Sequence, residues 1–226
     1  MADKYPSISP YAYCAWNPVK LVDPDGREGI CVINGNSIQV KIVVNYSQKE
    51  MDDYLKKIDY NYPNAFKEDF ENYFQKASGE YVIDGNTYDV QFDISFYNID
   101  ESKDGPEKTG AVNLKFDMGN NNSNHKENTI TMGNSPRLNT DKGDFRGSFA
   151  HELLHSLGLP DTKDTESGWL SSYSFDRKLS SDEISIMLTP CIQFAKQNEI
   201  SNGKILITCN RHTASGNYRN PPVLIE

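Results

Sequence analysis

The clearest pattern along the chain is an alternation of apolar and polar residues between positions 88 and 96. A period of two is that of a β-strand with one buried face. Apolar runs at residues 31–33 and 38–44 flank Asn34-Gly35, a strong signal for a tight hairpin between two strands. Further strands are expected over residues 81–99, 111–116 and 128–132, with a last strand at 204–209, and the tail from residue 210 is polar and contains proline.

Between these strands, apolar residues recur at the spacing of a helix. A capping box at residues 47–50 predicts a helix to about residue 60, and Pro63 predicts the start of a second helix with phenylalanines on one face. A third helix is expected from Asp144 to Leu157. A second capping box, Ser180 to Glu183, opens a fourth helix with Met187 on its apolar face. From residue 29 onward the pattern therefore predicts an α+β domain.

The third helix carries the residues with the most specific chemistry. His151 and His155 stand at i and i+4, which places both imidazoles on one helix face, close enough to share a metal ion. Glu152 lies between them in sequence and can take a proton from a metal-activated water molecule. Gly158 can end the helix in a left-handed conformation. The chain can then turn so that Asp161 supplies a third ligand, which leaves one position open as in catalytic zinc sites.

Residues 151–161 resemble the metzincin metallopeptidases in the variant whose third ligand is aspartate. The resemblance implies a mixed twisted sheet with an antiparallel edge strand, an active-site helix and a C-terminal helix, with Zn²⁺ as cofactor. It also implies a Met-containing turn beneath the metal, for which residues 168–173 are the better candidate. Leu170 then stands where Met is expected, Tyr173 resembles the oxyanion-stabilising tyrosine, and Met187 is an ordinary core residue.

The same resemblance suggests how a substrate is held, and two alternatives for the metal remain open. An extended peptide substrate is expected to pair with an antiparallel edge strand, for which the candidate residues are Thr129, Ile130, Thr131 and Met132. In the related gluzincins the third ligand is a downstream glutamate, for which Glu166 or Glu183 could serve. His125, just before the strand, could hold a second metal, although a solvated histidine is the simpler interpretation.

The composition of the chain makes some classes of substrate and location less favourable. The 226 residues carry a formal net charge of −9, which disfavours nucleic acid as a substrate. No apolar run reaches the length of a membrane span, and residues 1–15 lack the pattern of a signal peptide. The four cysteines allow three full pairings, among which the sequence does not choose, and buried free thiols are the expectation for so few. Cys14 could also act as a latency switch on the zinc, although no known latency motif surrounds it.

Residues 1–28 differ from the rest of the chain. They are rich in Pro and Tyr, with the blocks Ser9-Pro10-Tyr11, Asn17-Pro18 and Asp23-Pro24-Asp25-Gly26. This segment resembles the end of the core of RHS-repeat proteins, which are large secreted or surface proteins with a variable effector domain after this sequence. The resemblance implies two regions, an RHS-like end or linker at 1–28 and an effector domain at 29–226, carried at the tip of an exported toxin-like protein.

The expected function is that of a zinc endopeptidase with Glu152 as general base, His151, His155 and Asp161 as ligands and a protein or peptide as substrate. As a toxin effector it would have a cognate immunity protein that binds over the cleft. A zinc-binding adhesion or interaction module without turnover is the alternative from another class. A nuclease effector is disfavoured by the acidic charge and by the zinc-type helix.

Overall fold

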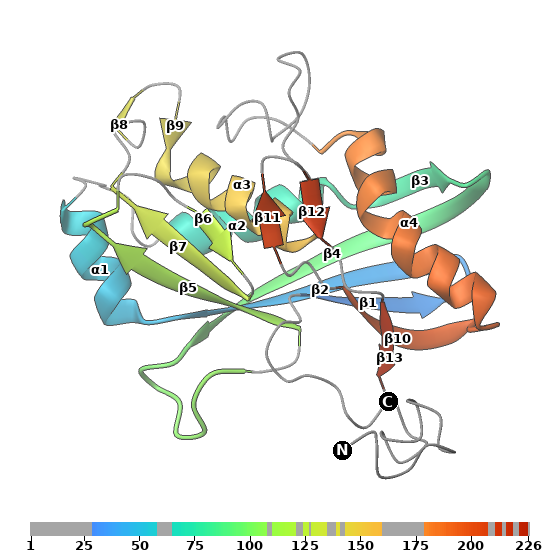
Figure 1. Ribbon diagram of the computed structural model, residues 1–226, viewed down its shortest axis with the longest axis horizontal. Coiled ribbons are helices and arrows are strands. Elements are labelled where there is room, and N and C mark those ends of the chain that lie inside the picture. The colour runs from blue at the N-terminus through green and yellow to red at the C-terminus, as the bar shows by residue number, and fades with distance from the viewer. Residues whose placement is uncertain are drawn as a thin grey trace, which may run out of the picture.

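The computed structural model describes residues 29–57, 65–107, 110–120, 124–126, 128–134, 139–140, 143–159, 179–207, 211–213, 216–218 and 222–225. The RHS-like segment 1–28 and the proposed turn at residues 168–173 lie outside these residues. The described part is an α+β structure, as the sequence predicts, with a mixed sheet and four helices (Figure 1).

Most of the described strands belong to one eleven-stranded mixed sheet. Its path runs β12-β11-β6-β7-β5-β2-β1-β10-β13, while β4 pairs with β2 and β3 pairs with β4. β2 is parallel to both β4 and β5, and β5 is parallel to β7. The strands of this sheet are β1 (Gly29–Asn34), β2 (Ser37–Tyr46), β3 (Gly79–Ile83), β4 (Asn86–Asn98), β5 (Ala111–Asp117), β6 (Asn124–Lys126), β7 (Thr129–Gly133), β10 (Asn202–Ile207), β11 (Arg211–Thr213), β12 (Gly216–Tyr218) and β13 (Val223–Ile225).

A small second sheet and four helices complete the described structure. β8 (Asn139–Thr140) and β9 (Gly143–Asp144) form an antiparallel pair just before the third helix. The helices are α1 (Gln48–Lys57), α2 (Ala65–Lys76), α3 (Phe145–Ser156) and α4 (Ser181–Gln197). No helix in the described part of the chain is both long and apolar enough to cross a bilayer.

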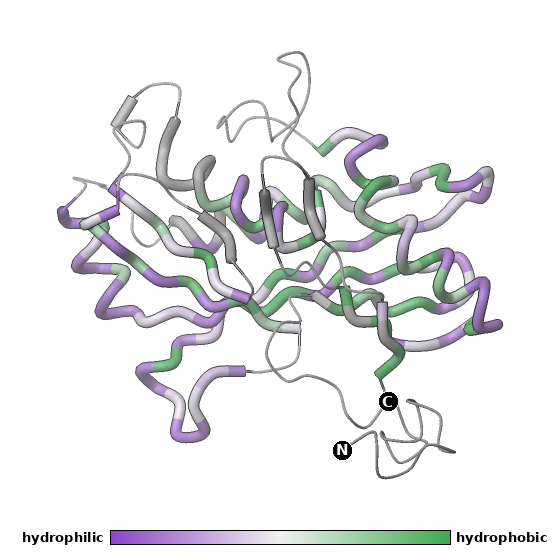
Figure 2. The backbone as a smooth tube through the Cα atoms, viewed as in Figure 1, coloured by the Kyte–Doolittle hydropathy of each residue, from purple (hydrophilic) through white to green (hydrophobic). Residues whose placement is uncertain are grey.

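The helices cover one face of the sheet. Along β4 the residues at even positions from 88 to 94 are buried while those at odd positions are exposed, as the alternation in sequence predicts. The aromatic rings of α2 and α3 pack on that buried face, with Phe70 next to Phe149 at 4.9 Å between centroids. Figure 2 shows hydrophobic residues along the central strands and hydrophilic residues on α1 and the outer turns. The exposed side of β2 and β4 is polar, and Gln39 Nε2 donates to Asp93 Oδ2 across it.

Local signals at the element ends are confirmed. The hairpin between β1 and β2 turns at Gly35, whose φ is +57°, and the register pairs Ile33 with Ile38. The Oγ atom of Ser47 accepts a hydrogen bond from the amide of Glu50 and so caps α1. Both halves of the Ser180–Glu183 capping box are present at the start of α4.

One prediction about the tail is wrong. The polar segment after residue 210 contains the short strands β11, β12 and β13, of which β13 pairs with β10 and β11 pairs with β6. These strands have only three residues each, so they show no periodicity that a sequence pattern could reveal.

Candidate metal centre

The helix α3 is buried along its whole second half. Phe149, Leu153 and Leu157 recur at helical spacing as an apolar stripe, and each has no exposed surface. The polar residues between them are buried as well, with 7% of His151, 6% of Glu152 and 1% of His155 exposed. Burying two imidazoles and a carboxyl group is costly unless they are engaged in hydrogen bonds or metal coordination, so their position calls for a chemical reason.

The two imidazole rings meet edge to face. Their centroids are 4.4 Å apart with an interplanar angle of 84°, and the two Nε2 atoms are 3.0 Å apart. The Nδ1 atom of His155 lies 2.7 Å from the carbonyl oxygen of Leu159. A carbonyl oxygen only accepts, so the hydrogen of a neutral His155 is on Nδ1 and its Nε2 presents a lone pair.

The position of the Leu159 carbonyl follows from the way α3 ends. Gly158 has φ +87°, its amide donates to the carbonyl of His155, and the amide of Leu159 donates to the carbonyl of Leu154. These two bonds form a Schellman motif, in which the residue after the glycine contacts the last turn of the helix. The motif turns the chain back so that the Leu159 carbonyl reaches the ring of His155. The predicted glycine C-cap is therefore confirmed, and the carbonyl partner of His155 is a feature that the sequence analysis missed.

The histidine pair fits a zinc ion. Zinc–nitrogen bonds of about 2.0–2.1 Å at a tetrahedral angle place two nitrogen ligands about 3.3 Å apart. The observed Nε2–Nε2 distance of 3.0 Å needs only a few tenths of an ångström of adjustment. The hydrogen bond from Nδ1 to a backbone carbonyl is the usual outer partner of a metal-binding histidine, because it orients the ring and directs Nε2 to the metal. The distance between the two Nε2 atoms and the carbonyl partner of His155 are therefore compatible with a zinc site.

Other residues of the predicted site lie outside the described part of the chain. These are the third ligand Asp161, the alternative ligand Glu166, Leu170 of the turn, and Tyr173. Among the described residues no group of three or more His, Cys, Asp and Glu side chains is arranged to hold a metal. The histidine pair and Glu152 are thus the described part of the candidate centre.

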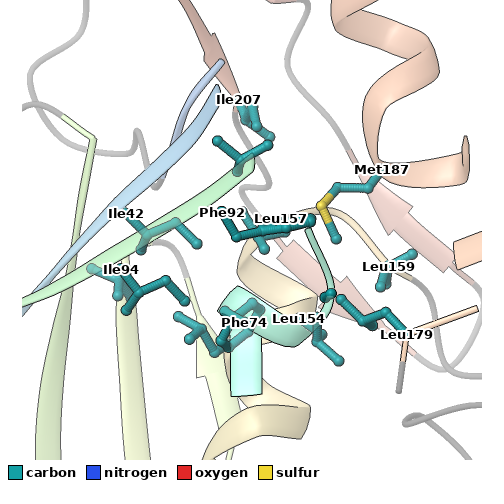
Figure 3. Close-up of a cluster of buried hydrophobic side chains, with 14 of the residues drawn as sticks. Ile42, Phe74, Phe92, Ile94, Leu154, Leu157, Leu159, Leu179, Met187 and Ile207 are labelled. Atoms are coloured by element: carbon teal, nitrogen blue, oxygen red, sulfur yellow. The ribbon is translucent and has the colours of Figure 1, made fainter. Parts of the chain in front are cut away.

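Glu183, the other alternative ligand, has a structural role in α4. Its Oε2 accepts a hydrogen bond from the amide of Ser180 at 2.8 Å, within the capping box. Met187, one turn further along the same helix, is fully buried and belongs to the core cluster, as predicted. Figure 3 shows Met187 in the same cluster of buried side chains as Leu157 and Leu159, which follow α3 in the chain. α4, which packs on β3 and β10, therefore contributes to the same core as the residues that follow α3.

The expectation for the substrate strand needs correction. β7, which contains Thr129, Ile130, Thr131 and Met132, is not an antiparallel edge: it runs parallel to β5 and pairs on its other side with β6. Ile130 and Met132 are fully buried. The antiparallel strand is β6, one strand earlier in the chain and too short to be recognised by period. His125, the candidate for a second metal, lies within β6 opposite Ile130, and its side chain is outside the description.

Comparison of the chain with models of protein families, with curated proteins and with solved structures found no significant match. The geometry of the histidine pair and the motif itself are therefore the basis for a functional proposal.

Proposed function

We propose that residues 29–226 form a zinc-dependent endopeptidase of the metzincin type, with His151, His155 and Asp161 as ligands and Glu152 as general base. The observation that carries the proposal is the buried histidine pair, with Nε2 atoms 3.0 Å apart and the Nδ1 atom of His155 held by a backbone carbonyl. A zinc ion at this position would polarise the scissile carbonyl and acidify a water molecule.

The chain's own residues have separable roles in this proposal. Glu152, buried beside the histidines in sequence, accepts the proton of the attacking water on its carboxylate and passes it to the leaving amine. The Leu159 carbonyl orients His155. The proposed substrate is an extended peptide, but β6 lies between β7 and β11 and is not a free edge with which it could pair. Tyr173 would stabilise the oxyanion, with Leu170 as the apolar floor of the centre.

We further propose that this domain is the effector of a larger exported RHS-type protein, secreted or at the cell surface. The support is the sequence of residues 1–28 and, in the effector region, a zinc-type helix. A toxin of this kind would be neutralised by an immunity protein over the cleft. The alternative function is that of a zinc-binding interaction module without turnover, because the same histidine pair could bind zinc without catalysis.

The test compares the wild type with Glu152→Gln. Both proteins are analysed for bound zinc by elemental mass spectrometry and are then incubated with a cell extract, in which new protein N-termini are counted. We expect zinc in both proteins and new termini with the wild type alone. If Glu152→Gln cleaves as fast as the wild type, Glu152 is not the base. Zinc in both proteins without new termini from either would favour the interaction module.

Ligand identity needs its own controls. His155→Ala and Asp161→Ala should each lose zinc, while His212→Ala, a histidine substitution on β11, should retain it. If zinc survives Asp161→Ala, the third ligand is a downstream glutamate such as Glu166. Circular dichroism of each variant separates loss of ligand from loss of fold.

A further inference from the structure

Two cysteines far apart in the sequence meet in the core. Cys31 lies on β1 and Cys191 on α4, and both belong to the same cluster of buried residues. Cys31 has no exposed surface and Cys191 has 1%. Cysteine is a small apolar residue in such a setting, so burial alone would explain neither a pairing nor a function.

The faces on which they lie are turned toward each other. Cys31 and Ile33 share the inward face of β1, because side chains alternate along a strand. Ile192 and Ala195, on the inward face of α4 beside Cys191, line a cavity of about 300 Å³ together with Ile33. β1 and α4 are therefore neighbours at the level of the two cysteines.

The thiols also influence each other directly. A hydrogen bond with the Cys191 thiol raises the pKa of Cys31 well above its usual value, and burial raises it further. Two thiols in hydrogen-bond contact that face each other from a strand and a helix can be bridged where their Cα atoms lie about 4.4–6.8 Å apart.

We propose that Cys31 and Cys191 form a disulfide bond when the chain folds in an oxidising environment. The thiolate of one cysteine attacks a small disulfide such as oxidised glutathione, which gives a mixed disulfide and releases one glutathione thiol. The thiolate of the second cysteine attacks the mixed disulfide and releases the other glutathione. Two protein thiols are oxidised, one glutathione disulfide is reduced to two thiols, and each takes up one proton.

The cross-link would close the chain from residue 31 to residue 191, a loop that contains α3 and the candidate metal centre. A bond across so long a loop restricts the unfolded chain strongly. It would also fix α4 to the sheet, and α4 carries Met187, which belongs to the same buried cluster as Leu157 (Figure 3). The proposal depends on the exported location as the source of oxidant and is independent of zinc and turnover.

The test uses the full chain with Cys14→Ser and Cys209→Ser, so that only Cys31 and Cys191 remain. The denatured and reduced protein is refolded with oxidised and reduced glutathione, because refolding removes the protection that burial gives to a folded thiol. Free thiols are then counted under denaturing conditions. We expect none, against two in a sample refolded with reductant. Two free thiols in the oxidised sample would overturn the proposal.

Stability and a peptide map provide the second readout. The oxidised protein should melt up to roughly 10 °C above its reduced form, and Cys31→Ala should abolish that difference. In the unmodified sequence a non-reducing peptide map should recover the peptides of Cys31 and Cys191 joined to each other. The proposed disulfide would be refuted if the cross-link lowered the melting temperature. It would also be refuted if the peptide map joined Cys31 or Cys191 to Cys14 or Cys209. Bound zinc, measured on the same samples, shows separately whether the metal centre is present.

Discussion

Replacing Gly158 by alanine tests whether the end of α3 positions the metal centre. Gly158 has φ +87°, and the turn that it makes places the Leu159 carbonyl 2.7 Å from His155 Nδ1. An alanine at this φ is strained, because its Cβ approaches the following carbonyl oxygen. The chain can relieve the strain only by moving away from the Schellman geometry, which takes the Leu159 carbonyl away from His155.

Two separate effects are expected, one on stability and one on zinc affinity. The left-handed conformation costs an L-residue roughly 1–2 kcal/mol. In a chain of this length that cost lowers the melting temperature by roughly 2–8 °C. Loss of the carbonyl partner of a metal-binding histidine weakens metal affinity by roughly 10–100-fold. Since a tenfold loss of affinity is about 1.4 kcal/mol, the two effects are of similar size, and the effect on zinc is the one specific to this position.

The matched control is Gly85→Ala. Gly85 has φ +75° in the turn between β3 and β4, and an added Cβ there has no atom within 4 Å. The backbone strain is similar, but the turn is remote in the fold from α3. Melting temperature is followed by circular dichroism and zinc affinity by competition with a fluorescent chelator. We expect both variants to lose stability and only Gly158→Ala to lose zinc. Equal zinc affinities in the two variants would refute the positioning role of the turn.

Three further predictions concern hydrogen bonds that stabilise the fold. Ser180→Ala removes the cap of α4 and should lower the free energy of unfolding by about 1 kcal/mol in a denaturant titration, whereas Ser180→Thr should retain most of it. Tyr54→Phe removes a buried hydrogen bond to the carbonyl of Gly133 at the end of β7 and should lower it by roughly 1–3 kcal/mol; an unchanged midpoint would contradict this. The pKa of Asp100 is held below its usual 3.8, chiefly by a hydrogen bond from the amide of Lys49 at the start of α1. The Asp100 carboxylate therefore stabilises the fold above pH 3.8. This stabilisation is lost as the pH falls through the lowered pKa. Asp100→Asn should therefore melt below the wild type at neutral pH and level with it in strong acid, and a gap that persists in acid would count against the interaction.

Sequence patterns predicted features that depend on a few neighbouring residues. The hairpin at Asn34-Gly35, both capping residues and the glycine end of α3 all appear in the structure, because each rests on a local conformational preference. The predicted one-faced burial of β4 is confirmed for the same reason. Of the candidate site, the placement of His151 and His155 on one helix face follows from helical geometry alone.

Strand partners could not be predicted in this way. A period of two tells which side of a strand is buried but not which strand lies beside it, so the parallel pairing of β2 with both β4 and β5 was not foreseen. For the same reason the sequence predicted β7 as the antiparallel edge strand, whereas in the structure the antiparallel strand is β6. The contact between Cys31 and Cys191 and the carbonyl partner of His155 likewise depend on the folded path of the chain.

The pairing of β1 with β10 has a consequence for when the domain can assemble. β1 lies between β2 and β10 in the sheet, and its residues pair with Asn202–Ile207. During synthesis, the central sheet therefore stays incomplete until residue 207 has been made, long after the α3 helix has emerged. Contacts between such distant segments form slowly, because the entropy of closing the long loop is lost before they are gained. A nascent or truncated chain that already contains His151 and His155 but ends before residue 202 would thus have β1 without its β10 partner, although β6 and β7, which contact α3, would be present.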